Sequence, residues 1–531
     1  MTAVRTVAAV DLGAESGRVA SVGFDGERLE LDIVHRFEHG PRVSDGVLRW
    51  DLDTLWGGVR AGLTALDGGR IPIASVGVDT WGVDYALRRP DGELVDEPTC
   101  YRDPRQLSGM SAAVARVGEA ELYRAAGVQL IPINTIFGLV SDVRDHPDRI
   151  TAASGLLMMP DLFHYLMSGA VTSEYTIAST TGALDTRTGE WAWGLLDQLG
   201  IPRRLLPEVV PPGTELGALR GGYGGALRNC RVIVPAAHDT ASAVVAAPLH
   251  SAGSIFISSG TWSLVGMETD RAWVTEDARR ANLTNEGGYG ATIRLLCNVM
   301  GLWLLQECRR QWAREGHRLG YPEIAELAGA QPGLASLVNP DATVFLAPGD
   351  MPRRIQDYCA RTHQRVPDSI GAIARCVIDS LALSYRRVIE AVGAVTGIAP
   401  PAVHIVGGGS GHTLLSQLTA DATGLPVYCG PGEATALGNA AVQLAALGEL
   451  AGLPDIRAVV AASTAPVEYL PRDGQDWVAA SALLATLVSA DSSSADSSNA
   501  DSSNADSSSA DTDTDPYQLQ PCATEESQCG D

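Results

Sequence analysis

The chain contains no lysine, so all 39 of its basic residues are arginines. This absence excludes a P-loop lysine, the strand lysine of protein kinases and every mechanism that needs a Schiff-base lysine. Any phosphate chemistry must therefore use backbone N–H groups, arginine and metal ions. Cysteine is also scarce, with nine in 531 residues and no Cys-X-X-Cys spacing. We therefore expect no zinc site and no dense disulfide framework, and we interpret the cysteines as buried thiols of a cytoplasmic protein.

The sequence also lacks a basic stripe. Its formal net charge is −24, and ten acidic residues without a base lie beyond residue 488, which leaves −14 for residues 1–488. An acidic chain of this kind argues against nucleic acid and anionic membrane surfaces as partners. We expect no signal peptide, because the apolar run 7–10 ends at Asp11. The uncharged stretch 240–267 is interrupted by proline, glycine and serine, which favours buried strand–turn–strand structure over a membrane helix.

What remains is the pattern of an α/β protein. Short β-rich runs alternate with helical periodicity, and the chain is long enough for two large cores. Residues 6–24 and 254–267 share the order strand, small-residue turn, strand, which indicates a duplicated architecture. We predict two α/β domains, 1–248 and 249–488. The tail 489–531 is predicted to be disordered, because its Ala-Asp-Ser-Ser repeats contain almost no apolar residues.

Smaller elements can be placed within these domains. Residues 74–87 read as two strands joined by a tight bend at 80–82. Helical periodicity predicts helices over residues 110–124, 156–167, 371–395 and 414–423.

Two of the turns have the composition of a phosphate site. In residues 11–18, Asp11 ends a strand and small residues then expose successive backbone N–H groups that can wrap phosphate oxygens. Asp11 can hold a hydrated Mg²⁺ opposite them, and Arg18 can add a bidentate phosphate contact. Residues 258–261 present hydroxyls and a glycine that suit a γ-phosphate. Either segment is equally compatible with a plain hairpin turn.

A short strand at 231–234 carries an adjacent His238–Asp239 pair onto a loop before a helix. Asp239 can act as a general base that takes a proton from a substrate hydroxyl, as phosphoryl transfer requires, and His238 can orient a substrate oxygen. The alternative is that Asp239 only caps the helix. A hydrolase has little support, because the chain has no Gly-X-Ser-X-Gly motif.

Residues 407–411 follow a strand and open a helix, which is typical of a close approach to a nucleotide. His412 stands where a dinucleotide fingerprint has its third glycine, so an adenosine contact is favoured over NAD binding. Residues 431–438 either lie beside this site or serve close helix packing.

Sugar recognition needs buried polar groups beside aromatic faces. Residues 79–84 and 282–288 supply such groups, together with Asn298, Trp303 and Gln306. Trp81 and Trp303 are equally compatible with filling the core.

Together these motifs resemble the FGGY carbohydrate kinases, in order and at similar spacing, over residues 11–18, 79–84, 235–240, 258–263, 282–288, 298–306 and 407–409. The resemblance extends from about residue 7 to residue 470. It implies an actin/hexokinase-like (ribonuclease H-like) fold of two α/β domains around a cleft, ATP- and Mg²⁺-dependent phosphorylation of a small ketose, and a monomer or small homo-oligomer. Within the family it is closest to members that phosphorylate L-rhamnulose at O1. Kinases of L-fuculose, L-ribulose, xylulose or glycerol and a non-catalytic ATP-dependent binding protein are the alternatives.

The same resemblance implies roles for individual residues, with Asp239 as the proton acceptor. The implied sugar contacts are Gly82, His238, Asp239, Thr240 and Asn298. The implied ATP contacts are Ala14, Glu15, Ser16, Gly17, Arg18, Thr261, Gln306 and Gly408. Glu15 departs from the family pattern, which has a small hydroxyl residue there. A carboxylate at this place repels a triphosphate unless it turns outward or joins the metal shell.

Overall fold

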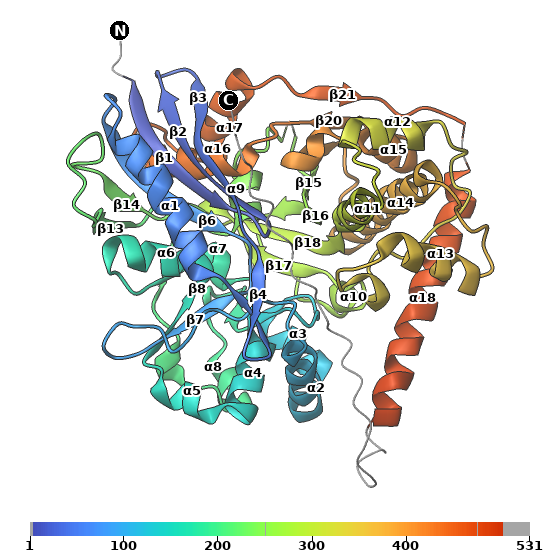
Figure 1. The fold of residues 1–531 in the computed structure, drawn as a ribbon, viewed down its shortest axis with the longest axis horizontal. Coiled ribbons are helices and arrows are strands. Elements are labelled where there is room, and N and C mark those ends of the chain that lie inside the picture. The colour runs from blue at the N-terminus through green and yellow to red at the C-terminus, as the bar shows by residue number, and fades with distance from the viewer. Residues whose placement is uncertain (1–3, 250, 475, 503–531) are drawn as a thin grey trace, which may run out of the picture.

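The computed structural model describes residues 4–249, 251–474 and 476–502, and two mixed β-sheets organise the chain (Figure 1). The first sheet has the strand order β13-β14-β6-β1-β2-β3, formed by Glu215–Ala218, Arg231–Ile233, Ile73–Thr80, Arg5–Leu12, Ser16–Phe24 and Leu29–Glu38. The second has the order β17-β18-β16-β15-β19-β20-β21, formed by Thr284–Gly287, Ile293–Met300, Trp262–Thr269, Ile255–Ser259, Val403–Val406, Val427–Cys429 and Val467–Tyr469.

The two predicted hairpins occupy matching places in these sheets. β1 is antiparallel to β2 and parallel to β6, and β15 is likewise antiparallel to β16 and parallel to β19. The repeat seen in the sequence therefore corresponds to a repeat of topology. Each hairpin tip lies where the parallel strands of its sheet end, which is the edge at which open α/β sheets bind ligands.

Helices cover both faces of the first sheet, so its central strand β1 is apolar on both sides. Ala8 and Val10 pack toward α1 (Leu52–Asp67) and α6 (Met159–Ser168). Val7 and Ala9 pack on the opposite face, in one cluster with side chains of α9 (Asp239–Val245) and α16 (Ala434–Ala446).

The helix α16 comes from the C-terminal half of the sequence but packs on the first sheet, and Figure 1 shows α16 and α17 (Leu453–Ser463) beside the N-terminal strands. Gln443 of α16 donates to the carbonyl of Ala8 at 2.9 Å. Asn439 donates to the carboxylate of Asp79 at 2.6 Å. The two halves of the sequence are therefore interlocked rather than merely adjacent.

The remaining elements are β4 (Pro41–Ser44), β5 (Val47–Trp50), β7 (Tyr85–Arg88), α2 (Arg105–Val117), α3 (Glu119–Ala126), α4 (Thr135–Asp145), α5 (Pro147–Ala152), β8 (Gly155–Met158), β9 (Ser173–Glu174), α7 (Tyr175–Ala178), β10 (Leu184–Asp185), β11 (Glu190–Trp191), α8 (Trp193–Leu199), η1 (Arg203–Leu205), β12 (Val209–Val210), α10 (Glu276–Arg280), η2 (Tyr289–Ala291), α11 (Trp303–Arg314), α12 (Tyr321–Gly329), η3 (Thr343–Phe345), α13 (Met351–Arg361), α14 (Ile370–Thr396), η4 (Gly408–Gly411), α15 (Thr413–Thr423) and α18 (Trp477–Ser502).

The predicted helices at 371–395 and 414–423 are confirmed as α14 and α15. The predicted helix at 110–124 is two helices, α2 and α3, because Gly118 between them has a φ of 82°, which breaks the helix. The helix expected from residue 156 starts only at Met159, after the strand β8. Residues 74–87 do form two strands, but β7 pairs with β8 and not with β6.

The structure differs from the prediction at the start of the tail. α18 continues to Ser502, and the Asp491 carboxylate accepts hydrogen bonds from Tyr358 and Asn339 at 2.8 and 2.9 Å. These contacts join the beginning of the acidic segment to Tyr358 of α13 and to the loop that holds Asn339. Composition alone does not reveal them. Residues 503–531 lie outside the described residues.

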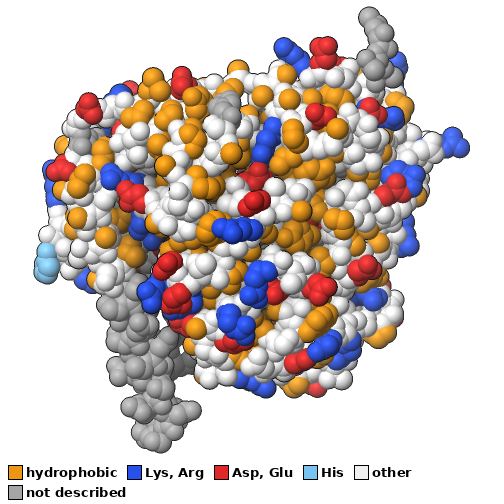
Figure 2. All heavy atoms as spheres, turned by 180° about the vertical axis from the view of Figure 1, so that it is seen from behind, with side chains coloured by type: hydrophobic (Ala, Val, Ile, Leu, Met, Phe, Trp, Pro, Cys, Tyr) orange, Lys and Arg blue, Asp and Glu red, His pale blue; other side chains and the backbone are white. Residues whose placement is uncertain are grey.

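No helix in the described ranges is long and apolar enough to span a membrane. The seven cysteines in these ranges are all buried and free. Figure 2 shows arginine and acidic side chains interspersed over one face of the molecule, without a continuous basic stripe among the residues described there.

The contact between α9 and α16 supports a first test. A Cβ on Gly438 would lie 1.8 Å from the carbonyl oxygen of Ser242, so we expect Gly438→Ala to lower the free energy of unfolding by about 1–3 kcal/mol. Gly57 in α1 has open space around it, and Gly57→Ala should raise this free energy by about 0.5–1 kcal/mol. Urea unfolding of both variants checks the pair, and equal effects would contradict the close packing.

Candidate active site

Two buried carboxylates, Asp11 and Asp79, and the partly exposed Asp239 lie near one another where neighbouring strands of the first sheet end. Asp11 on β1 lies directly opposite Asp79 on the parallel strand β6. The next bridge joins Thr80 to His238, and Asp239 follows at the start of α9. The sheet therefore brings the predicted turn 11–18 and the predicted His238–Asp239 pair to the same edge.

Burial raises the pKa of all three carboxylates, and neighbouring carboxylates add to this rise at Asp11 and Asp79. Burial raises the pKa of Asp11, the Arg18 guanidinium opposes this shift, and the charge of Asp239 adds to it. Burial and the charge of Asp11 raise the pKa of Asp79 well above its usual value. Burial also raises the pKa of Asp239, with His238 acting in the opposite direction. The site holds excess negative charge, so a bound cation would be stabilised there.

The donor set fits a hydrated Mg²⁺, which prefers one or two carboxylates together with water and phosphate oxygens. Asp79 Oδ1 is buried and has no hydrogen-bond partner, and it lies beside the Asp11 carboxylate, which suits such an ion. Within the ranges described, no cluster of three His, Cys, Asp or Glu side chains forms a ready-made metal cage. A cation bound here would be held mainly through water, and the assignment of Asp11 to it stays a prediction.

The first turn is compact at its base and open at its tip. The Gly13 N–H donates to the carbonyl of Ser16 at 3.0 Å, which closes the turn. Gly17 must be a glycine, because a Cβ there would lie 2.4 Å from the Phe37 ring. Ala14 and the residues up to Ser16 are only half-buried, so a ligand can reach them.

Two charged residues of this turn pair with the C-terminal half of the chain. Arg18 donates from Nε to Asp11 at 2.8 Å and from Nη1 to Glu433 at 2.7 Å. The Glu15 carboxylate lies 2.7 Å from Arg310 on α11. Glu15 thus pairs with an arginine of α11, which offsets its charge, and its nucleotide contact stays a prediction.

The second hairpin turn lies against the glycine-rich loop. A Cβ on Gly409 would lie 2.0 Å from Ser259 Oγ, whereas Gly408 has open space around it. The Thr261 carbonyl accepts hydrogen bonds from the backbone at the start of α11, and the Gln306 side chain on that helix has a buried Oε1 without a hydrogen-bond partner. Thr261, Gln306 and Gly408 therefore belong to neighbouring segments, as the sequence predicts for one binding region.

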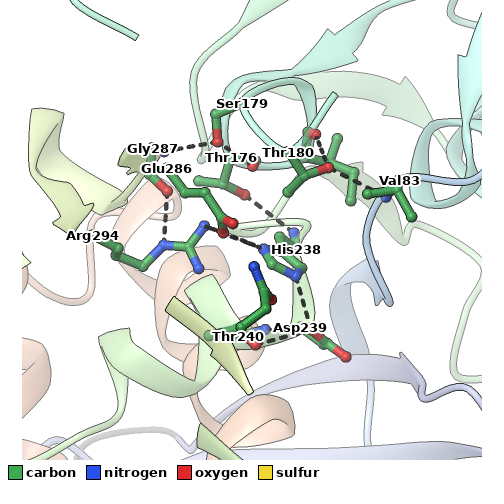
Figure 3. A network of polar contacts seen from close by, with 12 residues as sticks. Val83, Thr176, Ser179, Thr180, His238, Asp239, Thr240, Glu286, Gly287 and Arg294 are labelled. Carbon is green, nitrogen blue, oxygen red and sulfur yellow. Dashed lines mark hydrogen bonds and ion pairs between the residues drawn. The ribbon is translucent and has the colours of Figure 1, made fainter. Parts of the chain in front are cut away.

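His238 is the centre of a buried polar network (Figure 3). Its Nε2 lies 3.3 Å from Asp239 Oδ1. Its Nδ1 lies 3.3 Å from Glu286 Oε2 and 3.2 Å from Arg294 Nη2. The backbone N–H of His238 donates to Thr176 Oγ1 at 3.1 Å, which fixes the loop itself.

The other predicted sugar contacts border this network. A Cβ on Gly82 would lie 3.4 Å from His238 Nε2, so the two residues are neighbours. Val83, which follows Gly82, has a φ of 70°, a strained value for a β-branched residue. Thr240 donates its backbone N–H to Asp239 Oδ1 at 2.5 Å. Asn298 on β18 reaches the network through Glu286, whose pKa it helps to lower.

Three residues singled out for sugar recognition make structural contacts within the protein. Asp84 Oδ2 accepts hydrogen bonds from the indole N–H groups of Trp50 and Trp81 at 2.5 and 2.9 Å. Trp81 is buried and stacks on Trp50 at 4.2 Å. Trp303 is also buried and donates to the Phe345 carbonyl at 3.0 Å. Residues 431–438 were expected either to lie beside the nucleotide site or to pack closely between helices. Gly438 makes the close contact with α9 described above, as the second alternative predicts.

Several residues of the site were missed in the sequence. Arg294 is fully buried, and the signal for it was an arginine within an otherwise apolar strand. Asn298 donates both its backbone N–H and its side-chain amide N–H to Gln129 Oε1, at 2.9 and 3.0 Å. Asn439 lies 360 positions from Asp79, so no local pattern indicates their contact.

Comparison with known proteins is consistent with this geometry. Residues 6–246 match the N-terminal domain and residues 255–447 the C-terminal domain of the FGGY family of carbohydrate kinases. The chain belongs to this family. It is therefore a carbohydrate kinase, and the family predicted from the sequence is confirmed.

Curated relatives match this kinase over about nine-tenths of its length. It is 42 % identical over 477 residues to a protein named rhamnulokinase from Pectobacterium carotovorum, covering 90 % of this chain and 95 % of the relative. It is 39 % identical over 474 residues to a rhamnulokinase from Bacteroides thetaiotaomicron, covering 89 % and 97 %.

Solved structures confirm the predicted two-domain α/β fold. A gluconate kinase from Lactobacillus acidophilus aligns with a TM-score of 0.72 at 17 % identity, covering 94 % of this chain and 100 % of the other. A xylulose kinase from Rhodospirillum rubrum aligns with a TM-score of 0.72 at 17 % identity, covering 92 % and 99 %. At such low identity the likeness concerns the fold alone.

The buried Asp84 makes stability depend on pH. Burial raises its pKa from 3.8 to about 7, against the opposing hydrogen bonds of Trp81 and Trp50. The folded state then binds more protons than the unfolded state between these two values, so this group lowers stability as pH rises. Asp84→Asn removes the effect, and we expect the variant to gain about 2–3 kcal/mol relative to the wild type between pH 5 and pH 8.

Urea titrations of both proteins at the two pH values measure this difference. Asp32→Asn, at an exposed position of β3, is the matched control and should show no such trend. A pH-independent difference for Asp84→Asn would mean that this carboxyl is not desolvated in the folded protein.

Proposed function

We propose that this chain is an ATP-dependent rhamnulokinase, which transfers the γ-phosphoryl group of ATP to O1 of L-rhamnulose. The substrate is supported by relatives named rhamnulokinase that are 39–42 % identical over about nine-tenths of the chain. The reaction is supported above all by one observation, the position of Asp239 beside His238 at the strand ends that also carry Asp11.

In this proposal Asp239 takes the proton from the ketose hydroxyl. Its raised pKa makes the carboxylate a stronger base than an exposed aspartate. Its Oδ1 is already engaged by His238 and Thr240, and the side chain is 29 % exposed, so the second oxygen is available to a substrate. His238, Thr240, Gly82 and Asn298 hold the sugar so that one hydroxyl faces this oxygen.

The nucleotide would lie between the two hairpin turns. Backbone N–H groups of residues 14–17 wrap the phosphates and Arg18 adds a charged contact. Thr261, Gln306 and Gly408 hold the rest of the nucleotide. A Mg²⁺ ion held through water near Asp11 would offset charge on the phosphates.

The proposed domains 1–248 and 249–488, apart from α16, which packs on the first sheet, would close around both substrates. Closure excludes water, so that ATP is not simply hydrolysed. The enzyme is proposed to act in the cytoplasm as a monomer or small homo-oligomer.

Asp239→Asn tests the proposed base. The amide keeps the size of the side chain but cannot accept the proton, so kcat should fall roughly 10²–10⁴-fold while ATP binding is retained. A coupled assay of ADP release gives kcat, and equilibrium titration of the nucleotide provides the control. Near-normal turnover would remove Asp239 from this role.

A panel of ketoses and glycerol tests the proposed substrate. We expect kcat/KM for L-rhamnulose to exceed that for L-fuculose, L-ribulose, xylulose and glycerol by about tenfold or more, because a site with fitted polar groups discriminates strongly between hydroxyl arrangements. A higher value for another member of the panel would reassign the substrate within the family. ATP binding without sugar-dependent ADP release would indicate a non-catalytic protein.

A further inference from the structure

Glu286 and Arg294 form a buried ion pair at the edge of the second sheet. They lie directly opposite each other on β17 and β18, so their side chains share one face. Glu286 Oε2 lies 3.2 Å from Arg294 Nη2, and the two side chains are 4 % and 0 % exposed. Burial pushes the pKa of Glu286 upward, but the Arg294 charge and His238 outweigh it, so this pKa lies below its usual value.

The pair is directed at the first half of the chain. Edge strand β17 docks on α7 and on the residue that caps its C-terminus. Gly287 packs against Tyr175 of α7 and donates its N–H to Ser179 Oγ, just after the helix, at 2.7 Å. This contact places both charged groups within 3.3 Å of His238 Nδ1 (Figure 3). The second sheet thus reaches the residue that the proposed reaction uses to orient the sugar.

A structural role alone does not account for these two charges. Burial of an ion pair costs hydration free energy, and well-packed apolar residues usually hold two strands together equally well. The pair instead meets one nitrogen of the His238 ring, while the other nitrogen faces Asp239 Oδ1 at 3.3 Å. The ring is therefore held at both ends.

We propose that Glu286 and Arg294 are positioning residues of the reaction, which fix the His238 ring and through it the Asp239 carboxylate. This inference rests on the proposed function only for its consequence in catalysis. With His238 and Thr240 bound to Oδ1, Figure 3 shows the other oxygen of Asp239 pointing away from the network. Glu286 and Arg294 thus select which oxygen of Asp239 faces the substrate hydroxyl.

A double-mutant cycle tests this action through His238. Glu286→Gln keeps the shape of the side chain but loses the charge, and we expect kcat to fall about 10–100-fold with little change in KM for ATP, because the proton acceptor is misplaced. In a His238→Gln background the same change should cost less than about twofold, since the group it positions is already gone. Equal losses in both backgrounds would overturn the proposal.

Two further variants control for stability. Glu286→Gln/Arg294→Gln removes both charges together, so no buried charge is left unpaired if the single variant fails to fold. Asp379→Asn breaks another buried pair, that of Arg375 and Asp379 at 2.8 Å in α14, and should leave kcat unchanged within about twofold. A comparable loss of kcat in Asp379→Asn would identify a general effect of buried charge rather than positioning.

A second readout does not depend on turnover. In full-length protein with ¹⁵N-labelled histidine, the imidazole signals of His238 are identified by their loss in His238→Gln. We expect Glu286→Gln to shift these signals and Asp379→Asn to leave them in place. If no ketose is phosphorylated, the proposed function fails, but this spectrum still shows whether Glu286 and Arg294 fix the His238 ring. Unchanged His238 signals in Glu286→Gln would refute it.

Discussion

The buried negative charge at the end of the first sheet is the constraint on which the rest of the site depends. Asp11, Asp79 and Asp239 are held close together by strand register, and each of them has a raised pKa. Such a group of carboxylates is costly unless donors or cations surround it. The arrangement therefore depends on the donors that the rest of the chain brings to it.

Much of that compensation comes from distant parts of the chain. Asn439 of α16 donates to Asp79, and Arg294 of β18 lowers the pKa of Asp239 through its charge. Arg18 binds Asp11 through Nε and Glu433, at the start of α16, through Nη1. Each half of the protein thus supplies hydrogen-bond or charge partners to polar groups of the other half. These polar contacts accompany the apolar packing of α16 on the first sheet, although α16 belongs to the C-terminal half of the sequence.

The parts of the site that consist of adjacent residues could be predicted from the sequence. An apolar strand followed by Asp11 and a small-residue turn, or by His238 and Asp239, is visible in a few adjacent residues, and the structure brings these segments to one edge. The residue type of Asp84 did not decide its role, because an aspartate suits a sugar site and a structural acceptor equally well. Only its contacts with Trp50 and Trp81 reveal the difference. The start of the tail was misread for a related reason, since Asp491 is held by Tyr358, more than a hundred positions away.

The sequence by itself determined the α/β class, the duplicated hairpins and the residue types available for phosphoryl transfer, because strand periodicity and turn composition are local properties. Tertiary structure alone decided that Glu15 faces Arg310, that Gly438 meets Ser242 and that Glu286 and Arg294 close on His238. These contacts join residues far apart in the chain. Their free energy depends on burial and on which partner faces each polar atom, and both quantities exist only once the two sheets have come together.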